Sequence, residues 1–163
     1  MIIVVMGVAG AGKTTVGTLL AQQLGWEFAD ADAFHSAQNI EKIRRGIPLT
    51  DEDRAPWLTA LREAIRRWIA AKKNVVLACS ALKQTYRKHL CAGPEVKIVY
   101  LKGDYDLIFR RLEHRKGHFA TGQVLASQFG DLEEPTHAVV VEINHSPAEL
   151  VAEIRARLGL NSA

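Results

Sequence analysis

The sequence predicts an α/β fold in which five parallel strands form a doubly wound sheet with helices on both faces. One observation is an apolar run at 2–6 that leads without a spacer into a glycine-rich segment and then into a helical pattern. Another is that short apolar runs alternate along the chain with segments of helical periodicity. Ligands of such sheets bind at the carboxyl ends of the strands, so the residues that follow each strand are the candidates for function.

The elements follow from periodicity and from residues that begin or end helices. Strands are predicted at 2–6, 26–30, 74–79, 96–101 and 138–143. Helices are predicted at 13–24, at 35–45, from Asp53 through Ile69, between 83 and 93, at 105–115, at 124–132, and after Ser146. Pro56 places the start of the long helix near Asp53, because proline is tolerated where backbone N–H groups are unpaired. Asp104 and Ser146 are the expected caps of the helices that follow them.

The composition is that of one globular domain that spans 1–163. The chain has 163 residues, of which 48% are hydrophobic and 24% charged. Met1 opens directly onto the first strand, and no apolar run approaches the ~20 residues that span a bilayer, so we expect a cytoplasmic protein with no membrane partner. Cys79 and Cys91 are too few for a disulfide framework and lack metal-ligand spacing. The net charge is +3, and the basic residues are spread over several helices, so nucleic-acid binding is not indicated.

The glycine-rich segment matches the phosphate-binding P-loop pattern, Gly7-x-x-x-x-Gly12-Lys13-Thr14. Gly7, Gly10 and Gly12 allow backbone conformations in which successive N–H groups point inward at phosphate oxygens. A glycine-rich turn with an incidental lysine is the alternative. The strand before the loop and the helix after it favour the nucleotide site.

Side chains within the loop have expected roles in binding ATP and Mg²⁺. Lys13 is placed to bridge the β- and γ-phosphates, which makes it a catalytic residue as well. The Thr14 hydroxyl is placed to take one coordination position of Mg²⁺. Ala11 and Thr15 complete the predicted nucleotide-binding set.

Polar residues follow the second strand, where that strand reaches the phosphate edge of the sheet. Asp30 and Asp32 form an Asp-x-Asp pair, and His35 comes shortly after. Such carboxylates can orient Mg²⁺ waters, a role given to Asp30, or accept a proton from an attacking hydroxyl, a role given to Asp32. The alternative is a helix cap plus a surface carboxylate.

Two pairs of cations are further candidates. One pair follows the third strand, and the other precedes a break in the helical pattern. Lys83 and Arg87 are spaced i and i+4, either as a pair aimed at the substrate or as a solvated basic face. Arg111 and Arg115 lie one turn apart, where one guanidinium can stack on adenine and another can neutralise the transferring phosphoryl group. The stretch 116–122 that follows contains two glycines, and we expect it to be a mobile lid.

Longer strings of the chain resemble the bacterial gluconokinases. The resemblance extends over nearly the whole chain, and its most specific strings are Pro48-Leu49-x-Asp51-x-Asp53-Arg54-x-Pro56-Trp57, Cys79-Ser80-Ala81-Leu82-Lys83-x-x-Tyr86-Arg87 and Ser127-Gln128-Phe129-x-x-Leu132-Glu133-x-Pro135. It implies a fold like that of the nucleoside monophosphate kinases, a transfer of the ATP γ-phosphoryl group to the 6-hydroxyl of gluconate, and a homodimer.

A pocket for a small sugar acid also fits the residues themselves. One carboxylate and several hydroxyls suit a substrate site of Asp32, His35, Arg54, Lys83 and Arg87 better than a nucleobase does. Two alternatives stay open. One is a kinase of the same architecture for shikimate, a nucleoside monophosphate or another sugar acid. The other is a P-loop switch that hydrolyses ATP slowly, although the chain lacks an Asn-Lys-x-Asp guanine signature.

Overall fold

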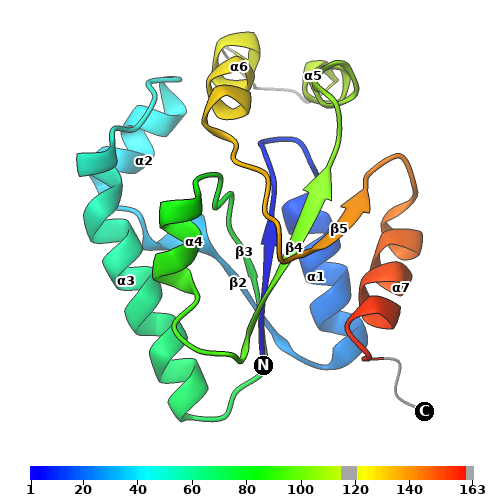
Figure 1. Ribbon diagram of the computed structural model, residues 1–163. Coiled ribbons are helices and arrows are strands. Elements are labelled where there is room, and N and C mark those ends of the chain that lie inside the picture. The colour runs from blue at the N-terminus through cyan, green and yellow to red at the C-terminus, as the bar shows by residue number, and fades with distance from the viewer. Residues whose placement is uncertain (115–120, 161–163) are drawn as a thin grey trace.

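Within residues 1–114 and 121–160, which the computed structural model describes, five parallel strands form one sheet in the order β2-β3-β1-β4-β5 (Figure 1). This confirms the predicted doubly wound sheet. The strands are β1 (Ile2–Met6), β2 (Glu27–Asp30), β3 (Val75–Ala78), β4 (Val96–Lys102) and β5 (Val139–Glu142). From β1 the chain first winds to one side and then, from β4, to the other. The carboxyl end of β1 is therefore the switch point at which ligands of such sheets bind.

Helices cover both faces of the sheet and surround its upper edge. On one face α1 (Lys13–Leu24) packs beside α7 (Pro147–Arg157), and on the other α3 (Asp51–Ala70) packs beside α4 (Gln84–Leu90). The helices α2 (Ala37–Arg44), α5 (Tyr105–Glu113) and α6 (Thr121–Asp131) lie at the top of Figure 1, around the carboxyl ends of the strands. The 3₁₀ turn η1 (Ala31–Phe34) joins β2 to the segment before α2.

The central strand is buried on both faces, as its unbroken apolar sequence indicates. Every residue of β1 has an exposed fraction of 0%. Ile3 and Val5 join the core under α1 and α7, whereas Ile2, Val4 and Met6 join the core under α3 and α4. Alternation of side chains along a strand produces this division, and burial on both faces holds the glycine-rich loop that follows β1 in a fixed place.

The long helix α3 begins at Asp51, before the position predicted from Pro56. Thr50 and Asp53 form a capping box, in which the Asp53 N–H donates to Thr50 Oγ1 at 3.1 Å and the Thr50 N–H donates to Asp53 Oδ2 at 2.9 Å. This reciprocal cap satisfies the first N–H groups and sets the start of the helix, so Pro56 lies inside it.

The starts of α5 and α7 agree with the sequence, whereas α6 begins at Thr121, before the predicted start at 124. Asp104 and Ser146 cap α5 and α7 as predicted, and Pro147 stands in the first turn of α7. Of the stretch 116–122, residues 121 and 122 belong to the first turn of α6, and 116–120 lie outside the described residues.

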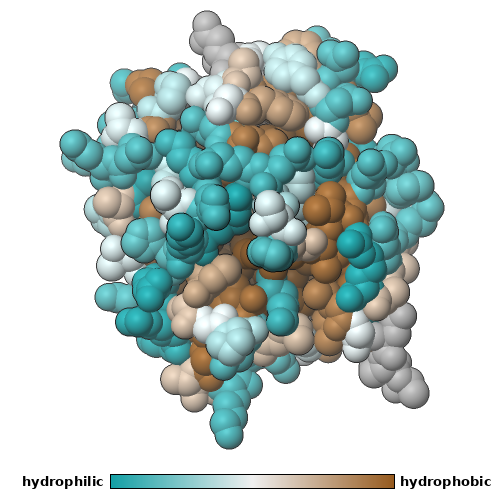
Figure 2. Space-filling view, viewed as in Figure 1, coloured by the Kyte–Doolittle hydropathy of each residue, from teal (hydrophilic) through white to brown (hydrophobic). Residues whose placement is uncertain are grey.

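The surface seen in Figure 2 is mostly hydrophilic, with its most apolar part over β4 and β5. The edge strand β5 is only half-buried at Val139 and Val140. Within the described part of the chain, no helix is both long enough and apolar enough to span a bilayer.

Candidate active site

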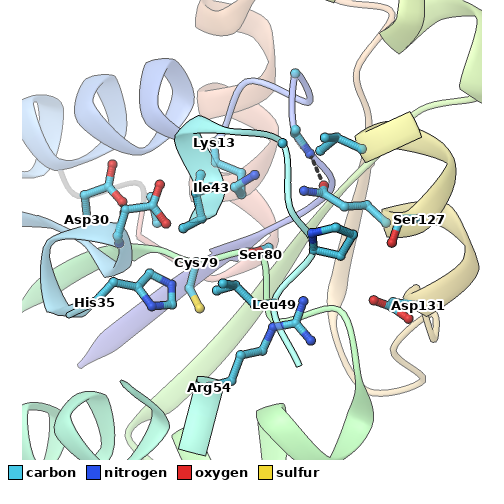
Figure 3. Close-up of a pocket in the computed structure, with 18 of the residues that line it drawn as sticks. Lys13, Asp30, His35, Ile43, Leu49, Arg54, Cys79, Ser80, Ser127 and Asp131 are labelled. Atoms are coloured by element: carbon cyan, nitrogen blue, oxygen red, sulfur yellow. Dashed lines mark hydrogen bonds between the residues drawn. The ribbon is translucent and has the colours of Figure 1, made fainter. Parts of the chain in front are cut away.

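A cavity of about 390 Å³ opens at the carboxyl ends of β1, β2 and β3, and its size is typical of small-ligand sites. Several elements contribute to it: the glycine-rich loop, the segment after β2, the start of α3, the end of β3 and one side of α6. Figure 3 shows Lys13, Asp30, His35, Arg54 and Asp131 around the same space. The polar residues in its lining are Lys13, Thr14, Asp30, Asp32, His35, Arg54, Ser80, Ser127, Gln128 and Asp131.

The glycine-rich loop adopts a backbone that side chains would disrupt. Gly10 has a φ of +81°, and a Cβ atom there would lie 2.8 Å from Leu112 Cγ. Gly12 has a φ of 97° and precedes α1 without a side-chain cap. The first N–H groups of α1 are thus available to an anion, and the helix dipole favours negative charge there.

Lys13 and Thr14 extend from the start of α1 into the cavity. The Lys13 ammonium donates to the carbonyl oxygens of Gly7 at 3.0 Å and Val8 at 3.1 Å, which keeps it over the opening of the loop. Of the other loop residues predicted to bind nucleotide, Ala11 is buried in the core and Thr15 is exposed on α1. Ala11 can therefore offer a ligand only its backbone.

Asp30 and Asp32 lie side by side where β2 ends, and their roles differ. Asp30 caps η1, because its Oδ1 accepts the Asp32 N–H at 2.9 Å. Asp32 is accessible from the open cavity, yet the surrounding protein withdraws it from bulk water. This desolvation raises the pKa of Asp32 above its ordinary value, and the neighbouring charge of Asp30 adds to the effect, while Lys13 and His35 oppose it. A carboxylate with a raised pKa is the more basic one, as a proton acceptor requires.

His35 is held flat against the start of α3. Its ring stacks on Trp57 with centroids 4.4 Å apart, and Trp57 Nε1 donates to the Ala31 carbonyl at 2.8 Å. Burial lowers the pKa of His35 below its ordinary value; the charge of Asp32 opposes this shift and that of Arg54 adds to it, so the ring is neutral at neutral pH. Asn39 Nδ2 lies 3.3 Å from His35 Nδ1 and donates there, which leaves the ring proton on Nε2.

Arg54 is positioned by a tyrosine from another helix. Its Nη1 donates to the Tyr86 hydroxyl at 2.8 Å, and that hydroxyl donates to Asp51 Oδ1 at 2.5 Å. The guanidinium also lies 5.5 Å from the centre of the Tyr86 ring. Because the Asp51 carboxylate accepts from Tyr86 and from Lys83, its pKa is lowered, and it stays ionised. The arrangement holds one planar cation at the cavity wall, which suits a substrate carboxylate.

Two oxygen-bearing residues at the loop fit a nucleotide-bound Mg²⁺ ion. Thr14 and Asp30 line the same cavity, and both offer the hard oxygen donors that Mg²⁺ prefers. Among the described residues, no group of three or more His, Cys, Asp or Glu side chains could hold a metal alone. Phosphate oxygens and water would therefore supply most of the coordination, as is usual for Mg²⁺.

Comparison with known proteins shows the family to which the chain belongs. The family model described as shikimate kinase matches residues 9–158. A probable gluconokinase of Mus musculus is 43% identical in an alignment of 178 positions, gaps included, that covers 96% of this chain and 97% of that protein. The thermoresistant gluconokinase of Escherichia coli K12 is 45% identical over 156 residues, or 93% of this chain and 89% of that protein. The chain belongs to the gluconokinase family.

The structure of a gluconokinase from Sinorhizobium meliloti 1021 matches this chain with a TM-score of 0.87 at 41% identity, covering 96% of this chain and 90% of that one. The sequence-based expectations of a gluconokinase relative and of a P-loop kinase fold are thus confirmed.

Two cations that the sequence predicts to bind substrate have protein partners in the structure. Arg87 is buried, and its guanidinium donates to the carbonyl oxygens of Ala81, Leu82 and Glu133. Lys83 precedes α4, and its Nζ lies 3.3 Å from Asp51 Oδ1. Neither residue lines the described cavity. The i, i+4 spacing brings both near one edge, but each side chain reaches a protein partner there.

Of the two arginines expected to bind nucleotide, Arg111 lies in the last turn of α5. Arg111 Nη2 donates to the Ile143 carbonyl at 2.6 Å, beside the loop after β5. Arg115 lies outside the described residues, as does most of the predicted lid. Their roles toward ATP stay predictions.

Residues that sequence reasoning did not assign complete the cavity. Ser127, Gln128 and Asp131 come from α6 and line the cavity. Figure 3 shows Ser127 and Asp131 on the side of the cavity opposite Asp30. Asn39 is buried, orients His35 and donates from Nδ2 to the Asp53 carbonyl at 2.7 Å. The signal for the α6 residues was the spacing of Ser127 and Gln128 from Asp131, i+4 and i+3, which places each of them next to Asp131 on the helix surface.

Proposed function

We propose that the protein transfers the γ-phosphoryl group of ATP to the 6-hydroxyl of gluconate and forms 6-phosphogluconate. The observation that carries this proposal is that the glycine-rich loop, Asp32 and Arg54 line one cavity. A phosphate-binding loop, a proton acceptor and a cation for a carboxylate are the groups that such a reaction needs. Membership of the gluconokinase family supports the same substrate.

The loop binds the nucleotide and stabilises the charge that shifts during transfer. Backbone N–H groups from Gly10 onward donate hydrogen bonds to phosphate oxygens, and Lys13 neutralises charge between the β- and γ-phosphates. When bound, Mg²⁺ neutralises further phosphate charge, and Thr14 and Asp30 are the residues that would hold it. Positioning and charge stabilisation supply most of the catalysis in phosphoryl transfer.

The acceptor is oriented from the opposite side of the cavity. Arg54 pairs with the gluconate carboxylate, and the neutral His35 donates from Nε2 to a substrate hydroxyl. Asp32 accepts the proton of the attacking 6-hydroxyl, for which its raised pKa suits it. Gluconate therefore lies with its carboxylate toward α3 and its reacting end toward the loop.

Further parts of the proposal concern the segment after α5 and the assembly. We propose that residues 116–122 close over ATP, with Arg111 and Arg115 at the nucleotide, and that the protein is a cytoplasmic homodimer. A non-hydrolysable ATP analogue with gluconate should then suppress protease cleavage within this segment. Light scattering on a size-exclusion column measures the oligomeric state.

A panel of acceptors tests the proposed function. Purified protein with ATP and Mg²⁺ is assayed for ADP release on gluconate, shikimate, AMP, glucose and other hexonates. We expect gluconate to have the highest kcat/KM. Shikimate is the runner-up, because the matching family model carries that description. Preference for shikimate, AMP or glucose would overturn the proposed substrate.

A further inference from the structure

A glutamine of α6 reaches across the cavity to the glycine-rich loop. Gln128 Oε1 accepts a hydrogen bond from the Ala9 N–H at 2.6 Å, the dashed line in Figure 3. The two residues are 119 positions apart in the chain, and both line the cavity. This contact ties the wall formed by α6 to the phosphate-binding loop.

The contact fixes which end of the amide faces the loop. A backbone N–H can only donate, so the side-chain oxygen of Gln128 must face Ala9, and the amino group must lie on the other branch. Within the described part of the chain, Nε2 has no protein acceptor, and it is not among the polar atoms buried without a partner. Its two N–H donors are therefore accessible from the cavity.

The order of groups along the loop indicates which phosphate these donors would meet when ATP is bound. Lys13, which in this motif reaches the β- and γ-phosphates, has its ammonium on the carbonyl oxygens of Gly7 and Val8. Ala9 follows Val8 directly, whereas the N–H groups at the start of α1 lie farther along the loop, toward the inner phosphates. Gln128 thus approaches the loop on its γ-phosphate side.

We propose that Gln128 is a catalytic residue that donates an N–H···O hydrogen bond from Nε2 to the γ-phosphoryl group during its transfer. This inference rests on the proposed kinase function. In the transfer, the bond from the γ-phosphorus to the β,γ-bridging oxygen breaks, a bond to the acceptor hydroxyl oxygen forms, and the hydroxyl proton passes to Asp32. Gln128 keeps its charge and its bonds, and stabilises the equatorial oxygens through a fixed donor.

The competing role is purely structural, in which Gln128 only holds the loop through Oε1. Two variants separate the roles. Gln128→Glu keeps an oxygen for the Ala9 N–H but removes the donors, and Gln128→Met removes both. Because Gln128→Glu also adds a negative charge that repels the phosphates, the neutral Gln128→Met variant decides between the roles. A structural role predicts that Gln128→Met loses the same affinity for ADP as for an ATP analogue. The proposed role predicts that Gln128→Met loses affinity for the ATP analogue and turnover, while its affinity for ADP stays close to that of the wild type.

The experiment measures nucleotide binding without any acceptor, and then turnover. ADP and a non-hydrolysable ATP analogue are titrated with Mg²⁺ by calorimetry, and kcat is measured with gluconate. Both variants should bind ADP within about threefold of wild type, bind the ATP analogue at least ~10-fold more weakly, and lose ~10²-fold in kcat, the effect of losing one oxyanion donor. Gln22→Glu on the exposed face of α1 controls only for the change in the net charge of the protein.

Two outcomes would overturn the proposal. These are a Gln128→Glu variant with kcat and analogue affinity within about threefold of wild type, or an equal loss of ADP and analogue affinity in both variants. If circular dichroism shows that Gln128→Glu does not fold, Gln128→Met decides through the same ADP-to-analogue comparison. Failure of the proposed substrate would look different, because the wild type would bind both nucleotides and fail to turn over gluconate.

Discussion

Arg87 donates from Nη2 to the backbone carbonyl of Glu133 at 2.7 Å, joining the loop after β3 to the segment that follows α6. Its Nη1 donates to the carbonyls of Ala81 at 2.7 Å and Leu82 at 2.9 Å. Ala81 has a φ of 46°, which is unfavourable for a residue with a side chain. A backbone conformation of this kind persists where the surroundings fix it, and Arg87 supplies that constraint.

Replacing Arg87 should therefore reduce stability more than substrate affinity. Arg87→Met leaves buried carbonyl oxygens without donors and should lower the free energy of unfolding by about 2–4 kcal/mol. Urea denaturation measures the loss, and Arg66→Met on the exposed side of α3 is the control, with an expected change within about 0.5 kcal/mol. A gluconate KM raised at least tenfold with stability unchanged would instead favour the direct substrate contact that the sequence predicts.

The P-loop interpretation predicts the effect of removing its lysine. Lys13→Ala should leave a folded protein whose kcat is lower by several orders of magnitude, because one cation in a dry phosphoryl-transfer site is worth roughly 3–5 kcal/mol. Circular dichroism and an ADP-release assay measure the fold and the activity. Turnover near the wild-type value would end the P-loop enzyme hypothesis.

Asp32 should set the acidic limb of the pH profile. Only the ionised carboxylate accepts a proton, so kcat/KM should fall as the pH decreases through the Asp32 pKa, which burial and Asp30 raise above the ordinary value. Asp32→Asn should remove this limb and lower kcat far more than it raises the KM for ATP. The pH dependence of gluconate turnover from pH 4 to 8 is the measurement.

The same shift fixes the sign of the effect on stability. A carboxyl with a raised folded-state pKa makes folding less favourable above that pKa, and the cost disappears below the unfolded-state value. Asp32→Asn should accordingly leave the melting temperature at pH 7 unchanged or higher. A lower melting temperature with normal kcat would show that Asp32 has a structural role only.

The two cysteines should differ in reactivity. Burial raises the pKa of Cys79 to about 12, so almost no thiolate exists at pH 8. Burial raises the pKa of Cys91 as well, but Cys91 is exposed at the end of α4, so a reagent can reach it. A thiol reagent at pH 8 should modify Cys91 in the native protein and Cys79 only after denaturation. Mass spectrometry of the labelled peptides identifies the site, and prompt native labelling of Cys79 would contradict its burial in the cavity wall.

The local parts of the site are the parts that sequence predicts. The loop from Gly7 to Thr14 and the Asp30-x-Asp32 pair follow strands directly, so strand order alone brings them to one edge. Arg54 and Arg87 show where such reasoning ends. Both have long side chains, but Arg54 meets Tyr86 at the cavity, and Arg87 is enclosed by backbone carbonyls that come together only in the folded chain.

The same limit applies to α6 and to α3. Gln128 meets Ala9 across 119 positions of sequence, and no periodicity encodes that contact. The start of α3 was misplaced because a reciprocal cap by Thr50 and Asp53 outweighs the preference of Pro56 for the first turn. A local rule fails where a second local interaction competes with it.

Arg54 should carry the preference for an acid over a neutral sugar. The Arg54 side chain is mostly buried, with an exposed fraction of 20%, and its anionic neighbour is Asp51, whose Oδ1 lies 3.9 Å from Arg54 Nη1 and whose side chain is 72% exposed. A substrate carboxylate adds a second anion on the cavity side, which glucose cannot supply. Arg54→Ala should raise the gluconate KM by about 10²-fold, narrow the gap between gluconate and glucose, and leave the KM for ATP nearly unchanged. Steady-state kinetics with each acceptor measure the three quantities.

Tyr86→Phe separates the charge of Arg54 from its position. The variant keeps the ring beneath Arg54 but removes the hydroxyl that accepts from Nη1 at 2.8 Å. Because the guanidinium stays charged yet loses one contact that orients it, the gluconate KM should rise by only about threefold to tenfold. If Tyr86→Phe weakens gluconate binding as much as Arg54→Ala does, Tyr86 itself must bind the substrate. If both variants leave the preference for gluconate over glucose intact, the carboxylate must be recognised by a residue other than Arg54.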